Sequence, residues 1–249
     1  MKILAINGSH RGRRGCTQLI LDKIAEGVTA AGGEMETVIL AEKKINSCLA
    51  CDHCSQAETR GHCVFEAADD VKSIFEQIRA ADIIVYGSPV YAFGLTGRMK
   101  TFIDRFNSTG TGAGLVLTKS GLIFHPVDKQ IVGKPMVVLT LCANLEQETV
   151  KNTLSYFSTF ASYVDAPIVG TLVRKMSMLL EKKEDPLVQE VLAAFVQSGH
   201  ELVLRGKISR GTEKKAARPL LKIPFLDFLL NFKAFKRKAI EQANSGSMF

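Results

Sequence analysis

Short apolar runs alternate with longer amphipathic stretches over most of the chain. The runs have the length and composition of buried β-strands and cover residues 2–6, 35–40, 82–86, 135–141 and 167–170. Between them, apolar residues recur every three or four positions, which predicts helices over residues 17–31, 67–81, 97–106, 147–163 and 186–205. Five strands alternating with five helices predict an α/β fold built on a parallel sheet. Because the strands are apolar throughout, we expect helices on both faces of the sheet.

Charge divides the chain into two parts. The 249 residues carry a formal net charge of +7. Residues 206–249 hold 10 Lys and Arg against 3 Asp and Glu, which gives 10 − 3 = +7, so residues 1–205 are neutral. We therefore predict a body over residues 1–205 and a basic C-terminal extension over residues 206–249. The neutral body argues against a nucleic-acid partner.

The extension predicts an amphipathic helix with a basic end. Its apolar face is formed by Phe225, Phe228, Leu229, Phe232 and Phe235, and the cations near its end are Lys233, Lys236, Arg237 and Lys238. We expect this face to pack on the body or on a second subunit, and contact with an anionic membrane surface is the alternative. The chain has no apolar run long enough for a transmembrane helix. Its N-terminal residues lack the pattern of a signal peptide, so the expected location is cytoplasmic.

The loop after the first predicted strand has the chemistry of a phosphate site. It runs from Asn7 to Thr17, is rich in glycine and arginine, and leads directly into a helix. Backbone N–H groups and the helix dipole attract an anion at such a helix start. Ser9 and Thr17 add hydroxyl groups and Arg11 adds a positive charge. An ordinary loop with a threonine N-cap is the alternative.

The loop after the third predicted strand carries two aromatic side chains. Pro89 and Gly94 favour a turn, and Tyr91 and Phe93 offer aromatic surface to a flat ring. Covering the edge of the sheet is the alternative role for this pair. In open parallel sheets, ligands bind at the carboxyl ends of the strands, so we expect this loop and the phosphate loop to converge.

These two loops resemble those of the flavodoxin-like NAD(P)H-dependent FMN reductase family. The matching residues are Gly8, Ser9, Arg11, Gly15 and Thr17, then the stretch 87–97 followed by Lys100, Phe102, Asp104 and Arg105. The resemblance covers residues 1–205 and implies a flavodoxin-like three-layer α/β/α sandwich with strand order 2-1-3-4-5. One departure is Cys16, where the family usually has asparagine. The glycine-rich segment 110–114 is expected to form a flap over the flavin, and His125 to be a surface or interface residue.

The resemblance implies that the first loop binds the FMN phosphate and that the second contacts the isoalloxazine ring. The implied FMN-binding residues are Ser9, Arg11, Gly15, Cys16, Thr17, Gln18, Pro89, Val90, Tyr91, Phe93, Gly94 and, after the fourth strand, Cys142. No protein residue needs a catalytic role, because the flavin carries the redox chemistry.

Four of the six cysteines form a compact motif at Cys48, Cys51, Cys54 and Cys63. Thiols with two-residue spacing hold iron–sulfur clusters or zinc. The motif resembles that of the iron–sulfur flavoproteins, a branch of the same family, and this implies a [4Fe-4S] cluster. A cysteine loop that is empty, redox-active or simply packed is the second alternative. A zinc site completed by His53 or His62 is the third.

The resemblance implies an FMN-dependent oxidoreductase that accepts hydride from NAD(P)H. The electrons would pass to a small-molecule or protein acceptor, and the protein would form a homo-oligomer. Two other functions remain as alternatives. One is an iron–sulfur flavoprotein that carries electrons between protein partners, and the other is a non-catalytic module that has lost its flavin.

Overall fold

The computed structural model describes residues 1–220 together with Arg237 and Glu241. The chain divides into two compact units, Met1–Arg218 and Pro219–Phe249, and the first unit contains the sheet. The apolar face predicted over residues 225–235 lies outside the described residues.

Five parallel strands form the sheet in the order β2-β1-β3-β6-β7. They are β1 (Lys2–Asn7), β2 (Glu34–Ile39), β3 (Ile83–Pro89), β6 (Met136–Leu141) and β7 (Ile168–Arg174). Counted along this sheet the order is 2-1-3-4-5, so the predicted flavodoxin-like sandwich is confirmed. The last strand runs past the predicted end at residue 170, because its pairing with β6 continues as far as Arg174 opposite Leu141.

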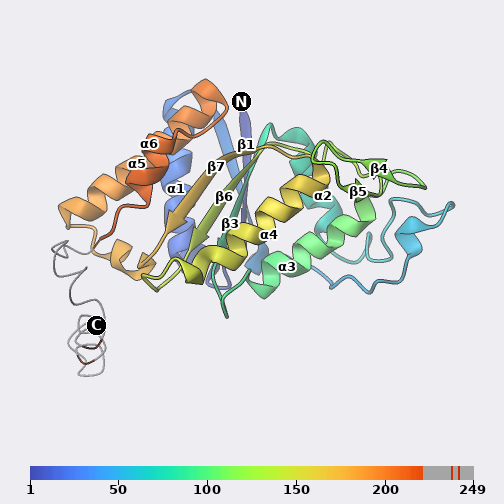
Figure 1. Cartoon of the computed structure of the whole chain (residues 1–249), viewed down its shortest axis with the longest axis horizontal. Coiled ribbons are helices and arrows are strands. Elements are labelled where there is room, and N and C mark those ends of the chain that lie inside the picture. Colours follow the sequence, from blue (N-terminus) through green and yellow to red (C-terminus); the bar gives the residue numbers. More distant parts are fainter. Residues whose placement is uncertain (221–236, 238–240, 242–249) are drawn as a thin grey trace. The chain divides into compact units, whose positions relative to one another are not determined.

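Helices cover both faces of the sheet (Figure 1). On one face lie α1 (Cys16–Ala30) and α5 (Pro186–Arg205), and on the other lie α2 (Val71–Ala80), α3 (Gly97–Asp104) and α4 (Glu148–Val164). The bounds of α5 agree with the prediction, because Asp185 caps its first turn and Gly206 ends it with a φ of 66°. Helix α2 begins at Val71, later than predicted. The preceding carboxylates of Asp69 and Asp70 accept hydrogen bonds from the amides of Asn46 and Lys44.

Two glycines let α1 and α5 pack with their backbones in close contact. A Cβ atom at Gly27 would lie 1.8 Å from the carbonyl oxygen of Val196, and one at Gly199 would lie 2.0 Å from that of Ile24. No side chain larger than hydrogen fits at either position, so this helix pair depends on both glycines.

A short helix, α6 (Arg210–Ala216), extends the first compact unit past residue 205. Buried Glu201 of α5 accepts hydrogen bonds from the Ser209 amide at 2.7 Å and the Thr212 hydroxyl at 2.9 Å. These bonds anchor α6 to α5, and the unit runs to Arg218 although its charge pattern suggested a boundary at residue 205.

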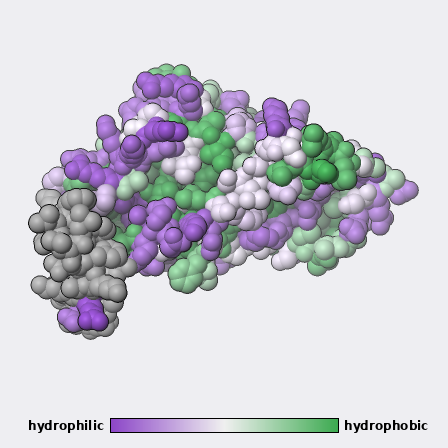
Figure 2. All heavy atoms as spheres, viewed as in Figure 1, coloured by the Kyte–Doolittle hydropathy of each residue, from purple (hydrophilic) through white to green (hydrophobic). Residues whose placement is uncertain are grey.

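The long connection after α3 contains a small hairpin of β4 (Val116–Leu117) and β5 (Ile123–Phe124). Leu115, Leu117 and Ile123 are exposed. Figure 2 shows an apolar patch in the region where this hairpin lies. None of the helices in the described part of the chain has the length and apolar character needed to cross a membrane.

Candidate functional site

The loop after β1 is fixed by short-range polar contacts. Ser9 is only 2% exposed, its amide donates to Oδ1 of Asn7 at 2.9 Å, and its hydroxyl accepts from the amide of Arg11 at 3.2 Å. The amide of Gly8 donates to the carbonyl of Gly87 on β3 at 2.8 Å. The loops after β1 and β3 therefore start from neighbouring, hydrogen-bonded strand ends.

The start of α1 has no side-chain cap. Its N-cap residue is Gly15, and a Cβ atom there would lie 2.9 Å from the Ser9 hydroxyl oxygen. Thr17 is buried in the first turn. The first N–H groups of a helix have no partner within the helix. Glycine at position 15 thus keeps open a space bordered by a hydroxyl group and free amides, which suits a phosphate.

The loop after β1 carries three exposed arginines, Arg11, Arg13 and Arg14, which differ in their partners. Arg13 is paired with Glu42 at 2.8 Å. In the described part of the chain, Arg11 and Arg14 form no ion pair. The charge of Arg11 is therefore not neutralised by an ion pair within the described residues.

The side chains of Cys16 and Gln18, at the start of α1, have different surroundings. The Cys16 thiol is half-buried, and burial, followed by the charge of Glu181, raises its pKa. Gln18 accepts from the side-chain amide of Asn7 at 2.8 Å and donates to Asp22 at 2.8 Å. Asn7, which the sequence analysis missed, therefore supplies a side-chain amide that braces the loop and the first turn of α1.

The aromatic loop after β3 is a tight turn. The amides and carbonyls of Tyr91 and Gly94 exchange two hydrogen bonds of 3.1 Å, while Ala92 and Phe93 have positive φ angles of 47° and 63°. Two successive positive φ angles are typical of a two-residue hairpin turn and cost energy in residues other than glycine. In this turn Phe93 is 64% exposed and Tyr91 is 38% exposed.

The two loops meet through their side chains. The rings of His10 and Tyr91 pack edge to face with centroids 5.3 Å apart. Pro89 ends β3, and the Val90 amide donates to the carbonyl of Leu141 at the end of β6 at 2.7 Å. Exposed aromatic surface thus lies next to the phosphate loop at the carboxyl edge of the sheet.

Thr96 is a second residue that the sequence analysis missed. It is fully buried, its hydroxyl donates to the carbonyl of Gly8 at 2.7 Å, and the same hydroxyl accepts from the Met99 amide at 3.1 Å. It therefore caps α3 and ties that helix to the phosphate loop. A threonine just before a predicted helix is the sequence signal for such a cap.

Cys142 directly follows β6 and is buried. Its thiol donates to the carbonyl of Asn144 at 3.4 Å, and its amide donates to the carbonyl of Arg174 at 3.0 Å. Burial raises its pKa. The residue lies at the predicted edge of the sheet, with its thiol bonded within its own loop.

The four cysteines of the motif line one cavity of about 480 Å³. All four are free thiols. The cavity wall also includes His53, Arg105 and His125 together with Gly110, Gly112 and Gly114. The segment 110–114, predicted as a flap over the flavin, borders the cysteine cavity. The long connection folds back over the cysteine loop, which its own sequence pattern does not reveal.

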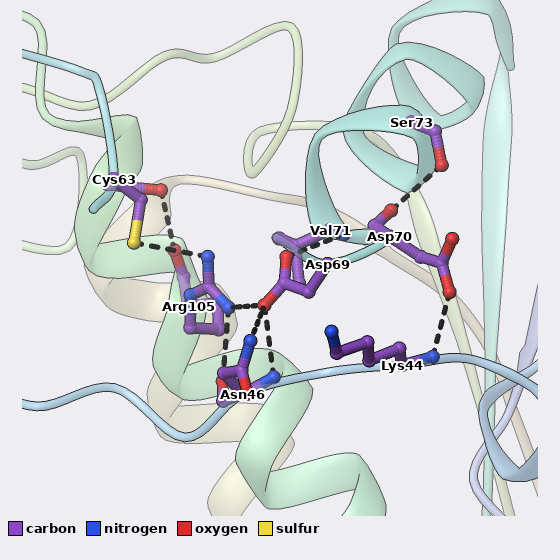
Figure 3. Close-up of polar contacts among 9 residues, drawn as sticks. Lys44, Asn46, Cys63, Asp69, Asp70, Val71, Ser73 and Arg105 are labelled. Atoms are coloured by element: carbon purple, nitrogen blue, oxygen red, sulfur yellow. Dashed lines mark hydrogen bonds and ion pairs between the residues drawn. The ribbon is translucent and has the colours of Figure 1, made fainter. Parts of the chain in front are cut away.

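Residues just after α3 hold three of these thiols. Arg105 donates from Nη2 to Sγ of Cys63 at 3.1 Å (Figure 3). Asn107 donates to Sγ of Cys48 at 3.7 Å and accepts from Sγ of Cys54 at 3.7 Å. Burial, and then the neighbouring Cys63 and Cys48, raise the pKa of Cys54.

The four cysteine thiols that line the cavity are the kind of ligand that holds an iron–sulfur cluster. Within the described residues, no three His, Cys, Asp or Glu side chains converge on a single metal position. His62 is bonded through Nδ1 to Glu66 at 2.8 Å. The structure thus gathers the four cysteines without forming a closed ligand group, and it pairs His62 with a carboxylate outside the cysteine set.

Comparisons with known proteins agree with this geometry. An iron-sulfur flavoprotein of Archaeoglobus fulgidus is 40% identical over 105 residues, which cover 42% of this chain and 48% of that protein. An FMN-dependent NADH:quinone oxidoreductase of Opitutus terrae is 26% identical over 152 residues, covering 57% of this chain and 67% of that protein. The chain spans about half the length of the iron-sulfur flavoproteins that it matches.

The fold is also found among solved structures. An FMN-dependent NADH-azoreductase from Bacillus anthracis, solved with FMN, superposes with a TM-score of 0.60 at 14% identity, over 82% of this chain and all of that one. The sequence model of the family described as NADPH-dependent FMN reductase matches residues 1–173. These residues include both loops at the carboxyl edge of the sheet and the cysteine motif. The chain belongs to the NADPH-dependent FMN reductase family.

Proposed function

We propose that this protein is an FMN-dependent oxidoreductase that accepts hydride from NAD(P)H and passes the electrons to a separate acceptor. The observation that carries the proposal is the meeting of two loops at one edge of the sheet. One offers an uncapped helix start with buried hydroxyls, and the other offers exposed aromatic rings. The loops contact each other where the ring centroids of His10 and Tyr91 lie 5.3 Å apart.

Each loop has a separate task in this proposal. Ser9, Thr17 and the first amides of α1 bind the phosphate of FMN, with Arg11 adding charge. Tyr91 and Phe93 present aromatic surface to the isoalloxazine ring. When bound, FMN supplies the hydride-accepting chemistry. The chain itself binds and orients the cofactor, and for this reason we assign no catalytic acid or base.

The test is flavin binding followed by anaerobic reduction. Wild-type protein should bind about one FMN per chain, and NADH or NADPH should bleach its visible absorption. Arg13→Ala is the matched control for Arg11→Ala, because Arg13 is already paired with Glu42. Failure to bind FMN, or no bleaching by either nucleotide, would contradict the proposal.

An iron–sulfur flavoprotein that carries electrons between protein partners is the second candidate. Four free thiols around one cavity support it, as do relatives that are named iron-sulfur flavoproteins. Thiolate ligands at Cys48, Cys51, Cys54 and Cys63 would hold a [4Fe-4S] cluster.

Iron and sulfide analysis of anaerobically purified protein tests this second candidate. Cys63→Ala should lose most of the iron and keep FMN. Cys142→Ala serves as the control because that thiol lies outside the cysteine cavity. Absence of iron from the wild type would rule out the cluster.

We further propose a homo-oligomer. The exposed hairpin residues Leu115, Leu117 and Ile123 support it, because an apolar patch of this kind commonly lies in an interface. Analytical ultracentrifugation of Leu117→Asp should show a smaller species than the wild type, and an unchanged species would exclude this surface. The cytoplasmic location and the contact of the tail with a membrane surface stay predictions from the sequence.

A further inference from the structure

One continuous segment connects the flavin edge to the cysteine cavity. It begins at the Tyr91–Gly94 turn, passes through α3, and continues into the short 3-10 helix Arg105–Thr109. Thr96 ties its start to the phosphate loop. Arg105 and Asn107 at its other end are bonded to the cysteines.

Arg105 is the most enclosed residue of this connection. It is 2% exposed and forms an ion pair with Asp69, whose side chain is completely buried. Its Nη1 also donates to the carbonyl of Asn46 at 3.0 Å, and its Nη2 donates to Sγ of Cys63 at 3.1 Å. Figure 3 shows the guanidinium group between these three partners. They come from both ends of the cysteine loop, residues 46–69.

Asp69 fixes the orientation of the guanidinium group. Its carboxylate accepts from the Asn46 amide at 3.0 Å and from the Val71 amide at 3.2 Å. Burial alone would raise the pKa of Asp69, but the hydrogen bonds from Arg105, Asn46 and Val71 lower it below its ordinary value. The pair is therefore charged, and backbone amides of Asn46 and Val71 hold the carboxylate that the guanidinium group contacts.

An ion pair alone does not explain this arrangement. Nε of Arg105 is buried without a partner in the part of the chain that the structure describes, and such groups call for a specific reason. Arg174 is equally buried, yet its guanidinium donates to the carbonyls of Lys175, Ala216 and Arg218. What distinguishes Arg105 is the bond that it makes to a cysteine of the motif.

We propose that Arg105 is the positioning residue of the cysteine site. Its planar fork joins Asn46 and Asp69 at the two ends of the loop and holds Cys63 at the cavity where Cys48, Cys51 and Cys54 lie. This inference deepens the iron–sulfur candidate and rests on it for the identity of the ligand. An N–H group donated to a ligand sulfur raises the reduction potential of a bound cluster.

The experiment compares Arg105→Lys with Arg174→Lys. Lysine keeps the charge but has one nitrogen, so it cannot contact Asp69, Asn46 and Cys63 together. Each protein is reconstituted anaerobically with ferrous iron, sulfide and FMN. Iron and FMN per chain and the midpoint potential of the cluster are then measured. Hydrogen exchange over residues 46–69 is measured separately in metal-free protein.

Arg105→Lys should keep wild-type FMN content, show a lower midpoint potential, and exchange faster over residues 46–69. Arg174→Lys should match the wild type in all three measurements. Wild-type potential and exchange in Arg105→Lys would overturn the proposal. If Arg105→Lys does not fold, Asp69→Asn replaces it, because this variant weakens the contact of the same guanidinium group. Asp69→Asn should also lower the midpoint potential and speed hydrogen exchange over residues 46–69. No change in either measurement would equally overturn the proposal.

The iron–sulfur hypothesis and the positioning role of Arg105 can be refuted independently of each other. A wild-type protein that takes up no iron would exclude the cluster but would leave hydrogen exchange of the metal-free variants to decide on Arg105. Faster exchange would then support the anchoring role, and unchanged exchange would refute it.

Discussion

The loops at the flavin edge and the cysteine loop are held by different kinds of interaction. At the flavin edge, neighbouring strand ends fix the loops through backbone bonds such as Gly8 to Gly87 at 2.8 Å, and Ser9 is buried among them. Over residues 46–69 the structure has only a single 3-10 turn, His53–Ser55, and positive φ angles at Ala50 and Asp52. Side chains from distant parts of the sequence hold this loop.

The difference indicates how each site should respond to change. The register of the sheet places the flavin loops, so only changes in the loops themselves, or in the packing of α1, should disturb them. The cysteine loop depends on a few side-chain contacts. The ion pair between Arg105 and Asp69 is the most buried of these contacts. A single substitution there should affect one site and spare the other.

The largest effect is expected at the phosphate loop. Ser9→Ala combined with Arg11→Ala removes a hydroxyl and a charged donor, each worth about 1.5–3 kcal/mol in a charge-assisted bond. The dissociation constant of FMN, measured by fluorescence titration, should rise about a hundredfold or more. Iron content should not change. Stoichiometric FMN that stays bound through gel filtration would show that this loop is misassigned.

The next largest effect is a loss of folding stability, expected at Asp69. Asp69→Ala leaves the Arg105 guanidinium buried without its counter-charge, which lowers the free energy of unfolding by about 3–5 kcal/mol. Urea denaturation measures the change. Asp104→Ala is the control, since it breaks an exposed pair with Lys100 and should have little effect. Equal losses in the two variants would mean that the buried pair has no special weight.

A smaller effect is expected where α1 meets α5. Gly199→Ala places a methyl group against the carbonyl of Ile24, and overpacking of this kind costs about 1–3 kcal/mol. Because the phosphate site is at the start of α1, FMN affinity should fall along with the melting temperature. Hydrogen exchange over residues 46–69 should not change. Gly97→Ala, which meets no atom within 4 Å, should leave both properties intact.

The smallest effect is the response of stability to acid. The pKa of Asp69 is lowered in the folded state, so its stabilising contribution is complete above the unfolded pKa of about 3.9 and is lost as pH falls through the lower folded value. The difference in unfolding free energy between wild type and Asp69→Asn should therefore narrow below about pH 4. A difference that stays constant down to pH 3 would exclude this linkage.

The alternation of apolar runs and amphipathic stretches was sufficient to predict a parallel sheet covered by helices on both faces. The strand order came from the resemblance to the FMN reductase family. The alternation also located the two loops that we propose bind flavin, because both are continuous segments that directly follow strands. Local features set these elements, such as the Asp185 cap and Gly206 at the ends of α5. The apolar periodicity and the turn residues of an element lie close together in the sequence. Short stretches of sequence are therefore enough to predict such elements.

Contacts between distant residues were decided only by the tertiary structure. The Thr96–Gly8 bond joins residues 88 apart, and the Arg105–Cys63 bond joins residues 42 apart. The segment 110–114 was predicted to form a flap over the flavin, and its place beside the cysteines became visible only in the fold. The cysteine spacing predicted a shared site, while the buried arginine that holds Cys63 follows from packing alone. Such pairs form because the sheet and helices bring these residues together, and no local pattern specifies which buried charge meets which thiol.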